Sequence, residues 1–413
     1  MMEAQVAEVI KQQIAPEEHV APGGFSGFIA KFSVLRDGRR ELWLTFLIKL
    51  LIYTAYSVTN KTMVLWLSKD LGFSDQGASA LVGWVWAPAM TIFTLLAGSL
   101  TDAIGLRRTF FLGVAICTFA RTVMVLTLNP TLALVCGLLP LAVGEALGTP
   151  VLLAATRVYS TTAQRSISFS IIYALMNVGY FVAGYVFDFI RSLDLHLNIA
   201  GFRPTTHEQL FGVSLALEIL LFPTIYFLRR NAERSGSDRQ LQARQSSLGF
   251  WSGIARTFQQ GASDTASLFR KLIGQSGFYR LLVFFLFIGF LKAIFLQMDY
   301  VFPKFGDREM GLHAPVGKLA GINAILIIVL APIVGALTQR IASYRIVIIG
   351  SVICAAGVFI MALPADWFVP AANGALGGAL GHGYLQLTGT VHPYYIMSAL
   401  YLTVFSVGEA FYS

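Results

Sequence analysis

The sequence predicts an all-α polytopic membrane protein made of two pseudo-symmetric helix bundles. Hydrophobic residues make up 56% of the 413-residue chain and charged residues only 13%, about half the charged share of an ordinary soluble domain. Apolar stretches long enough to cross a bilayer as a helix, which takes about 20 residues, recur along the chain. Two short motifs of the first half also return in the second half, which indicates an internal repeat.

The apolar stretches define ten candidate membrane spans, six before a long polar segment and four after it. They cover residues 42–67, 77–101, 109–128, 131–155, 167–190, 209–228, 280–302, 315–339, 344–363 and 394–413. A second repeat that matched the first would contain six spans. We therefore expect twelve spans in total, of which this sequence holds ten.

Polar composition divides the rest of the chain. Residues 1–41 are mixed in charge and contain no apolar segment near Met1, which favours a cytoplasmic N-terminal tail over a cleaved signal peptide. Residues 42–228 form the first, six-helix bundle, and residues 279–413 form the second, with four helices. The arginine-rich residues 229–278 between them predict a basic cytoplasmic linker that lies partly on anionic lipid.

Basic residues gather on one side of this topology. Arg107, Arg108 and the 229–278 linker share that side, whereas the 365–392 connection on the other side has no lysine or arginine. The 303–314 connection, on that same other side, is an exception because it contains Lys304 and Arg308. The positive-inside rule makes the basic side, with the N-terminus, cytoplasmic. The same bias explains the net charge of +8, so the expected partner is the lipid bilayer and not a nucleic acid.

The turn between the second and third spans carries a compact motif. Gly98 ends an apolar run, Asp102 supplies a carboxylate, Gly105 permits a turn, and Arg107 and Arg108 precede the next apolar run. This segment resembles the signature Gly-x-Leu-x-Asp-x-x-Gly-Arg-Arg between helices 2 and 3 of the major facilitator superfamily. The resemblance implies the major facilitator fold and a secondary transporter, with these five residues as a cytoplasmic gate motif.

The second half repeats these features. Residues 335–345 reproduce the spacing of residues 98–108, with Gln339 in the place of the acid. The tetrapeptide Val-Gly-Glu-Ala occurs twice and puts Glu145 and Glu409 at related positions. Transporters built from two repeats bind substrate near the middle of the membrane, where the repeats meet. We therefore expect the two carboxylates to share one central cavity.

Other segments resemble the proton-coupled oligopeptide transporter branch of that superfamily. They are residues 67–75 after the first span, Phe169, Tyr173, Asn177 and Gly179 in the fifth, and Gly408-Glu409 in the tenth. The helix-1 motif of that branch, Glu-x-x-Glu-Arg, would fall near Lys49, Ile52 and Tyr53, where no acid or arginine stands. The helix-4 lysine of the branch is missing as well, so we expect a relative with a different substrate.

Polar residues inside the spans are the candidates for a transport pathway. Lys49, Tyr53, Tyr56, Ser57 and Asn60 form one stripe at helical spacing on the first span. A stripe of this kind would be unstable against lipid, so it either lines a pathway or packs against polar neighbours. The first interpretation is the one we favour.

Charged residues within spans are costly and usually face a cavity or a partner. Glu145 and Glu409 are expected either to couple transport to protons or to be structural acids paired with Lys49 or Lys292. Arg121 is expected to pair with an acid or to contact an anionic substrate, Asp299 to act at a gate, and Glu218 to be structural. The expected pathway set is Lys49, Tyr53, Tyr56, Asn60, Arg121, Glu145, Tyr173, Asn177, Lys292, Asp299 and Glu409.

These features favour a secondary active transporter that moves a small polar or amphipathic solute by alternating access, with protons as the candidate coupling ion. The alternative is a transporter-like receptor or scaffold that does not transport. No nucleophile–base pair and no spacing of metal ligands stands out in the sequence. An enzyme, a metal site and an organic cofactor are therefore not expected.

Overall fold

The structure is a computed structural model that describes residues 34–198, 201–228, 270–338 and 341–411, with the isolated positions 259, 263 and 267. The side chains of Asp102 and Lys292 lie outside this description. So do most of the predicted N-terminal tail and most of the predicted 229–278 linker. Every element of the described chain is a helix, which confirms the all-α prediction.

The first bundle contains six long helical runs. They are α3 (Arg40–Lys69), α4 (Asp75–Ala80) continued by η1 (Leu81–Trp86) and α5 (Ala87–Ile104), α6 (Leu106–Leu126), α7 (Pro130–Leu132) continued by η2 (Ala133–Leu138) and α8 (Leu139–Tyr159), α9 (Thr162–Leu193) and α10 (Thr206–Tyr226). Local sequence explains several of their ends. Thr161 with Gln164, and Thr205 with Glu208, form capping boxes at the beginnings of α9 and α10. Gly105 adopts a φ of +87° between α5 and α6, so the predicted turn is present.

The second bundle contains four long helices and several short ones. The long helices are α13 (Ser276–Tyr300), α15 (Val316–Leu337), α16 (Ser343–Ile360) and α19 (Pro393–Ala410). The eight-residue helix α14 (Phe302–Glu309) follows α13. Between α16 and α19 lie the short elements η4 (Ala365–Phe368), α17 (Val369–Ala372), α18 (Ala375–Gly377) and η5 (Gly378–Tyr384).

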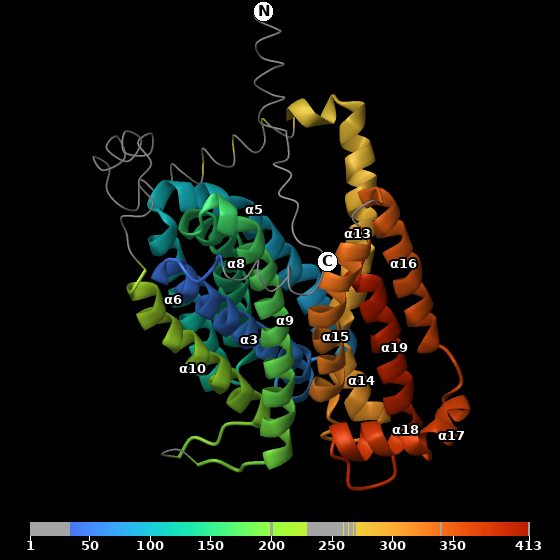
Figure 1. Ribbon diagram of the computed structural model, residues 1–413. Coiled ribbons are helices and arrows are strands. Elements are labelled where there is room, and N and C mark those ends of the chain that lie inside the picture. Colours follow the sequence, from blue (N-terminus) through green and yellow to red (C-terminus); the bar gives the residue numbers. More distant parts are fainter. Residues whose placement is uncertain are drawn as a thin grey trace, which may run out of the picture.

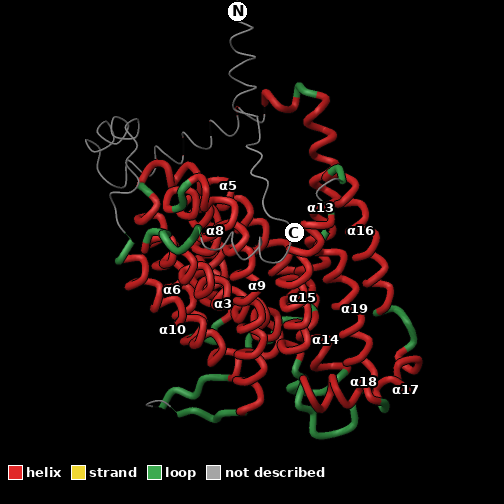
Figure 2. The backbone as a smooth tube through the Cα atoms, viewed as in Figure 1, coloured by secondary structure: helices red, strands yellow, loops and turns green. Residues whose placement is uncertain are grey.

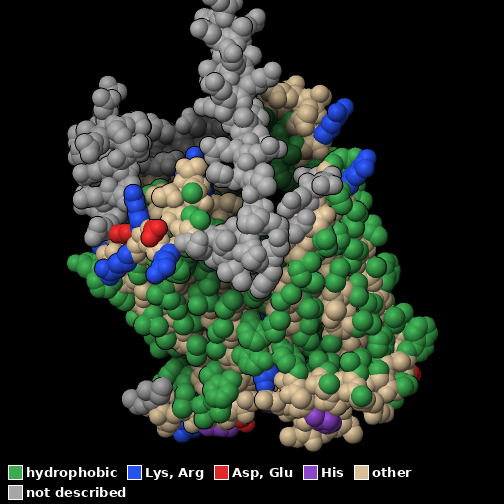
Figure 3. Space-filling view, viewed as in Figure 1, with side chains coloured by type: hydrophobic (Ala, Val, Ile, Leu, Met, Phe, Trp, Pro, Cys, Tyr) green, Lys and Arg blue, Asp and Glu red, His purple; other side chains and the backbone are tan. Residues whose placement is uncertain are grey.

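Each of the ten predicted spans coincides with one of these helical runs. Seven runs are long and apolar enough to cross a membrane, or eight if the bent pair Tyr344–Ile360 and Ala365–Ala372 counts as one span. Ten is therefore an approximate number of spans. Figure 3 shows a broad hydrophobic surface on the visible face, with lysine and arginine side chains near its margins. The chain is a multi-pass integral membrane protein.

The two bundles stand side by side, with α3 to α10 in one and α13 to α19 in the other (Figures 1 and 2). They approach most closely where α9 meets α15. A Cβ atom on Gly184 would lie 2.3 Å from the carbonyl oxygen of Gly317, and one on Gly317 would lie 2.2 Å from that of Gly184. Only glycine at both positions permits this contact, because a side chain would enter the opposite backbone.

The helix packing repeats between the bundles. In the first, a Cβ on Gly144 of α8 would lie 2.6 Å from Sγ of Cys117 on α6. In the second, a Cβ on Gly408 of α19 would lie 2.6 Å from Sγ of Cys354 on α16. Cys117 and Cys354 are separated by the same interval as Gly98 and Gly335 in the repeated motif. The two halves thus use the same small-residue contact at the same place, as an internal repeat requires.

Candidate functional site

A cavity of about 230 Å³ lies between the bundles. Its walls come from α3, α5, α6, α8, α9, α10, α13 and α19. Its polar and aromatic lining consists of Tyr53, Tyr56, Thr109, Phe110, Cys117, Arg121, Glu145, Thr149, Tyr180, Glu218, Phe295 and Glu409. Glu145 and Glu409 therefore line one cavity, as the repeat predicts.

Arg121 on α6 is the centre of a buried ion cluster. Its Nη2 donates to Oε1 of Glu145 at 2.8 Å, and its Nη1 donates to Oε2 of Glu218 at 2.9 Å. Its Nε donates to Oγ1 of Thr59 on α3 at 3.2 Å. The Arg121, Glu145 and Glu218 side chains are only 1%, 6% and 5% exposed. A planar guanidinium with several fixed donors suits this arrangement better than a lysine would.

The cluster corrects one expectation from the sequence. Glu145 pairs with Arg121, whereas Lys49 makes no ion pair with any residue that the structure describes. The Nζ of Lys49 instead lies 3.6 Å from the ring centroid of Tyr53. Glu218, which was expected to be structural, lines the cavity and pairs with Arg121. The other expected partner of Glu145 was Lys292, whose side chain lies outside the described residues.

Glu409 enters the cavity from the second bundle. The amide nitrogen of Asn323 on α15 donates to Oε2 of Glu409 and to Oγ of Ser406, both at 3.0 Å. All three side chains are buried. This amide therefore holds the carboxylate from the neighbouring helix of the same bundle, so the two related acids face the cavity with different partners.

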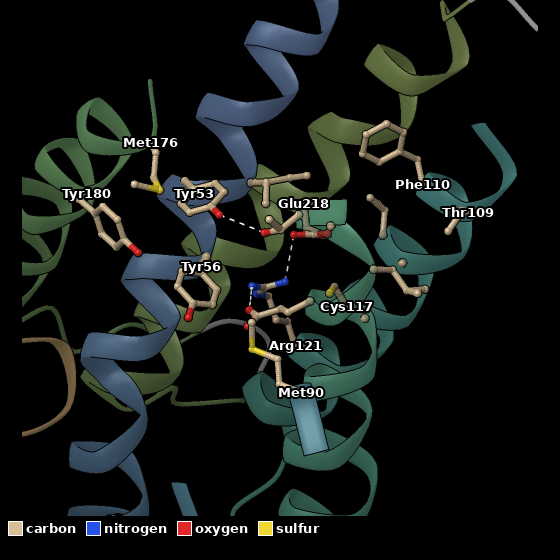
Figure 4. A pocket seen from close by; sticks show the side chains of 18 of the residues that line it. Tyr53, Tyr56, Met90, Thr109, Phe110, Cys117, Arg121, Met176, Tyr180 and Glu218 are labelled. Atoms are coloured by element: carbon tan, nitrogen blue, oxygen red, sulfur yellow. Dashed lines mark hydrogen bonds and ion pairs between the residues drawn. The ribbon is translucent and has the colours of Figure 1, made fainter. Parts of the chain in front are cut away.

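Aromatic rings form one side of the cavity. Tyr53 and Tyr56 project from α3, and Tyr180 projects from α9, toward the space that Arg121 faces from α6 (Figure 4). The Tyr53 and Tyr180 ring centroids are 6.0 Å apart, and those of Tyr180 and Phe295 are 5.9 Å apart. The hydroxyls of Tyr53 and Thr149 are 3.0 Å apart. The rings thus cross from the first bundle to the second.

Several residues of the expected pathway lie beside the cavity and do not line it. Asn60 is fully buried in α3. Asn177 donates to the carbonyl of Tyr173 in its own helix at 3.1 Å, and Tyr173 packs near Val334 and Ala410. These residues contribute to the packing around the site.

A second charged region joins the bundles at one end of the molecule, which we call the α14 end. Asp299 pairs with Lys61 of α3, and Asp307 pairs with both Lys69 of α3 and Arg191 of α9. Asp75 at the beginning of α4 pairs with Lys304, at 2.5 Å, and with Arg308. We call these five pairs the clasp. The sequence interpretation placed Asp299 at a gate but missed Lys61, although a lysine inside an apolar span is itself a signal.

Asp188 adds a further link at the α14 end. Its carboxylate oxygens accept the backbone N–H groups of Gly317, at 2.9 Å, and Lys318, at 2.6 Å. These groups lie in the first turn of α15, where unpaired N–H donors and the helix dipole favour a negative charge. A side chain of the first bundle thus caps a helix of the second.

The opposite end carries the Gly98–Arg108 motif. Arg107 lies over the rings of Phe111 and Tyr226, at 5.6 and 5.1 Å from their centroids, and Arg108 is exposed. The cavity extends toward this end, because Thr109 and Phe110 at the beginning of α6 line it. The gate role of Asp102 depends on a side chain outside the described residues.

Comparison with known families identifies the class of protein. The model of the Major Facilitator Superfamily matches residues 45–412. The chain belongs to this superfamily, so it is a membrane transporter of the secondary type and not an enzyme. Comparison with curated proteins finds no significant match.

Solved structures share the fold at low sequence identity. One is a bacterial homologue of the human drug peptide transporters, with 16% identity and a TM-score of 0.61, over 90% of this chain and 82% of that one. Another is a POT family transporter in complex with 5-aminolevulinic acid, with 13% identity and a TM-score of 0.62, over the same shares. A third is a peptide transporter POT in complex with sulfate, with 16% identity and a TM-score of 0.57, over 97% and 83%. The expected nearness to this branch is confirmed for the fold.

Proposed function

We propose that this transporter moves a small polar or amphipathic solute through the central cavity by alternating access. The main support is the position of the cavity. Side chains from both bundles line it, including the repeat-related acids Glu145 and Glu409. A site between two bundles becomes accessible from one side or the other as the bundles rock against each other.

The proposed orientation puts the α14 end outside. Arg107 and Arg108 at the opposite end then face the cytoplasm, in agreement with the positive-inside rule. In this orientation the clasp and the Asp188 cap close the outer side. The cavity lies on the cytoplasmic side of the Lys61–Asp299 pair. The described conformation is therefore closed to the outside.

Protons are the coupling ion that the Arg121 cluster favours. One guanidinium faces two carboxylates, Glu145 and Glu218, so the cluster carries a net charge of −1 when all three groups are ionised. A net charge buried in a membrane protein is unfavourable. Binding one proton or one cation neutralises the cluster, which makes it suitable for coupling.

The test begins with a thermal-shift screen of the purified protein against a solute library. A ligand at 100 times its Kd stabilises a protein by about 2.7 kcal/mol, which is easily detected. Solutes that bind are then tested in proteoliposomes, where we expect counterflow and an uptake that collapses when a protonophore removes the pH gradient. Solutes that bind without any counterflow would favour the receptor or scaffold alternative.

A further inference from the structure

One carboxylate oxygen in the cavity has no donor. Glu145 Oε1 accepts from Arg121, whereas Glu145 Oε2 is buried and has no hydrogen-bond partner among the described residues. The side chain is 6% exposed and lines the cavity. A buried acceptor without a donor is unfavourable, so this oxygen favours a solute that brings an N–H or O–H group.

The charge of the arginine beside it is already balanced by two acids. The three described contacts of Arg121 use its Nε and both Nη atoms, with Thr59, Glu218 and Glu145 as acceptors. These contacts use three of the five N–H donors of the guanidinium, but a carboxylate or phosphate solute would add a negative charge to a cluster that already holds two acids for one arginine. A larger net charge buried in the membrane is unfavourable. This part of the cavity therefore selects against anions.

The aromatic side of the cavity suits a cation with an apolar body. Tyr56, Tyr180 and Phe295 line it, and aromatic faces attract ammonium groups. The protein already contains such a contact, because the ammonium of Lys49 lies 3.6 Å from the Tyr53 ring centroid. A volume of about 230 Å³ is below the range of about 300–1,000 Å³ typical of drug-sized ligands. The solute is therefore small.

We propose that the cavity binds a small monovalent organic cation, a primary or secondary ammonium with an apolar or aromatic body; this inference rests on the transport function proposed above. The ammonium N–H donates to Glu145 Oε2, and the body packs between Tyr56, Tyr180 and Phe295. A proton and an ammonium N–H compete for the same oxygen. Binding of the cation therefore releases the proton held by the cluster to solvent, and transport exchanges one proton for one cation.

The binding test uses benzylammonium, with benzyl alcohol and benzoate as neutral and anionic analogues of similar shape. Of the three compounds, only benzylammonium should raise the Tm of the purified full chain. In weakly buffered solution its binding should release about one proton per cation. The apparent affinity should fall on acidification, by up to about tenfold per pH unit when one proton competes.

Variants test whether binding and proton release depend on Glu145 and Tyr180. Glu145→Gln should lose both the Tm shift and the proton release, whereas Glu145→Asp should keep the proton release with weaker binding. Tyr180→Leu removes a ring that contacts the solute body and should bind roughly fivefold more weakly. Asp366→Asn, an exposed acid outside the cavity, is the matched control and should change nothing.

The outcomes separate this inference from the transport function. No Tm shift with benzylammonium, equal stabilisation by benzoate, or unchanged binding in Glu145→Gln would overturn the cation site. If another solute still showed counterflow in that case, the proposed transport function would stand. If benzylammonium bound in competition with protons but was not carried into proteoliposomes, the cation site would stand and the transport function would be contradicted.

Discussion

The ion pairs at the α14 end and those in the central cavity connect different parts of the molecule. At the α14 end, all five pairs of the clasp join one bundle to the other. In the centre, Arg121 pairs with Glu145 and Glu218, which belong to α8 and α10 of its own bundle. The two regions are therefore affected differently when the bundles move apart.

Pairs between bundles must break as that end opens, whereas pairs within a bundle can persist through the movement. The clasp is thus suited to hold one conformation, and the Arg121 cluster is suited to present the same ion pairs to the cavity in every conformation. Burial differs within the clasp as well. Asp307 is 4% exposed at its side chain, while Asp75 is 34% exposed. The stability of the closed end should depend mainly on the buried acids, Asp299 and Asp307.

The largest expected effect concerns the central cluster. Arg121→Ala leaves two carboxylates buried without their common partner, so we expect a loss of about 3–5 kcal/mol in stability. The readout is the Tm and the yield of folded protein in detergent. Adding Glu145→Gln and Glu218→Gln should recover much of the loss, because the uncompensated charges disappear. Arg108→Ala, at an exposed position, is the control, and an equal loss there would contradict the special role of Arg121.

The next largest effect concerns the buried part of the clasp. Asp307→Asn breaks the pairs with Lys69 and Arg191 and should favour opening of the α14 end by about 3 kcal/mol. That corresponds to about a hundredfold shift in population. Spin labels at the exposed positions Ser192 and Leu312, one in each bundle, should move apart. Glu309→Gln on the same helix is exposed and should leave the distance unchanged.

A smaller effect is expected from the glycine contact between α9 and α15. Gly184→Ala would put a methyl group 2.3 Å from a backbone oxygen of the other bundle, an overpacking that typically costs about 1–3 kcal/mol. The cost falls only on the closed state, so the same spin-label pair should show more of the open distance. A Cβ at Gly212 would have open space around it, so Gly212→Ala should leave the distance between the spin labels unchanged. A closed distance that persists in Gly184→Ala would show that the helices can slide past each other.

The smallest effect should come from the exposed part of the clasp. Asp75→Asn removes the pairs with Lys304 and Arg308, and exposed pairs contribute about 0–1 kcal/mol. Raising the salt concentration should reproduce this small shift in the parent protein, because salt screens exposed charges. The same salt should have little influence on the Asp307 pairs. If Asp75→Asn shifted the population as much as Asp307→Asn does, the two acids would contribute equally despite their different burial, which would contradict this prediction.

The sequence by itself predicted the helices and their repeat, because these depend on local composition. Hydrophobic length located each of the ten helical runs, and the positive φ of Gly105 agrees with the predicted turn. The paired Val-Gly-Glu-Ala motifs correctly put Glu145 and Glu409 in one cavity. Helix α14 was expected only as a charged connection, since eight residues are too few for a span.

Only the tertiary structure decided which charges meet. Arg121, Glu145 and Glu218 lie on three helices, and Lys61 meets Asp299 across the two bundles. Sequence periodicity tells which face of a helix is polar, but not how the helix is rotated against its neighbours or at which depth two faces meet. Lys49 shows this best, because the polar stripe of its helix is visible in the sequence, whereas only the structure shows that its ammonium lies against the Tyr53 ring and not against an acid.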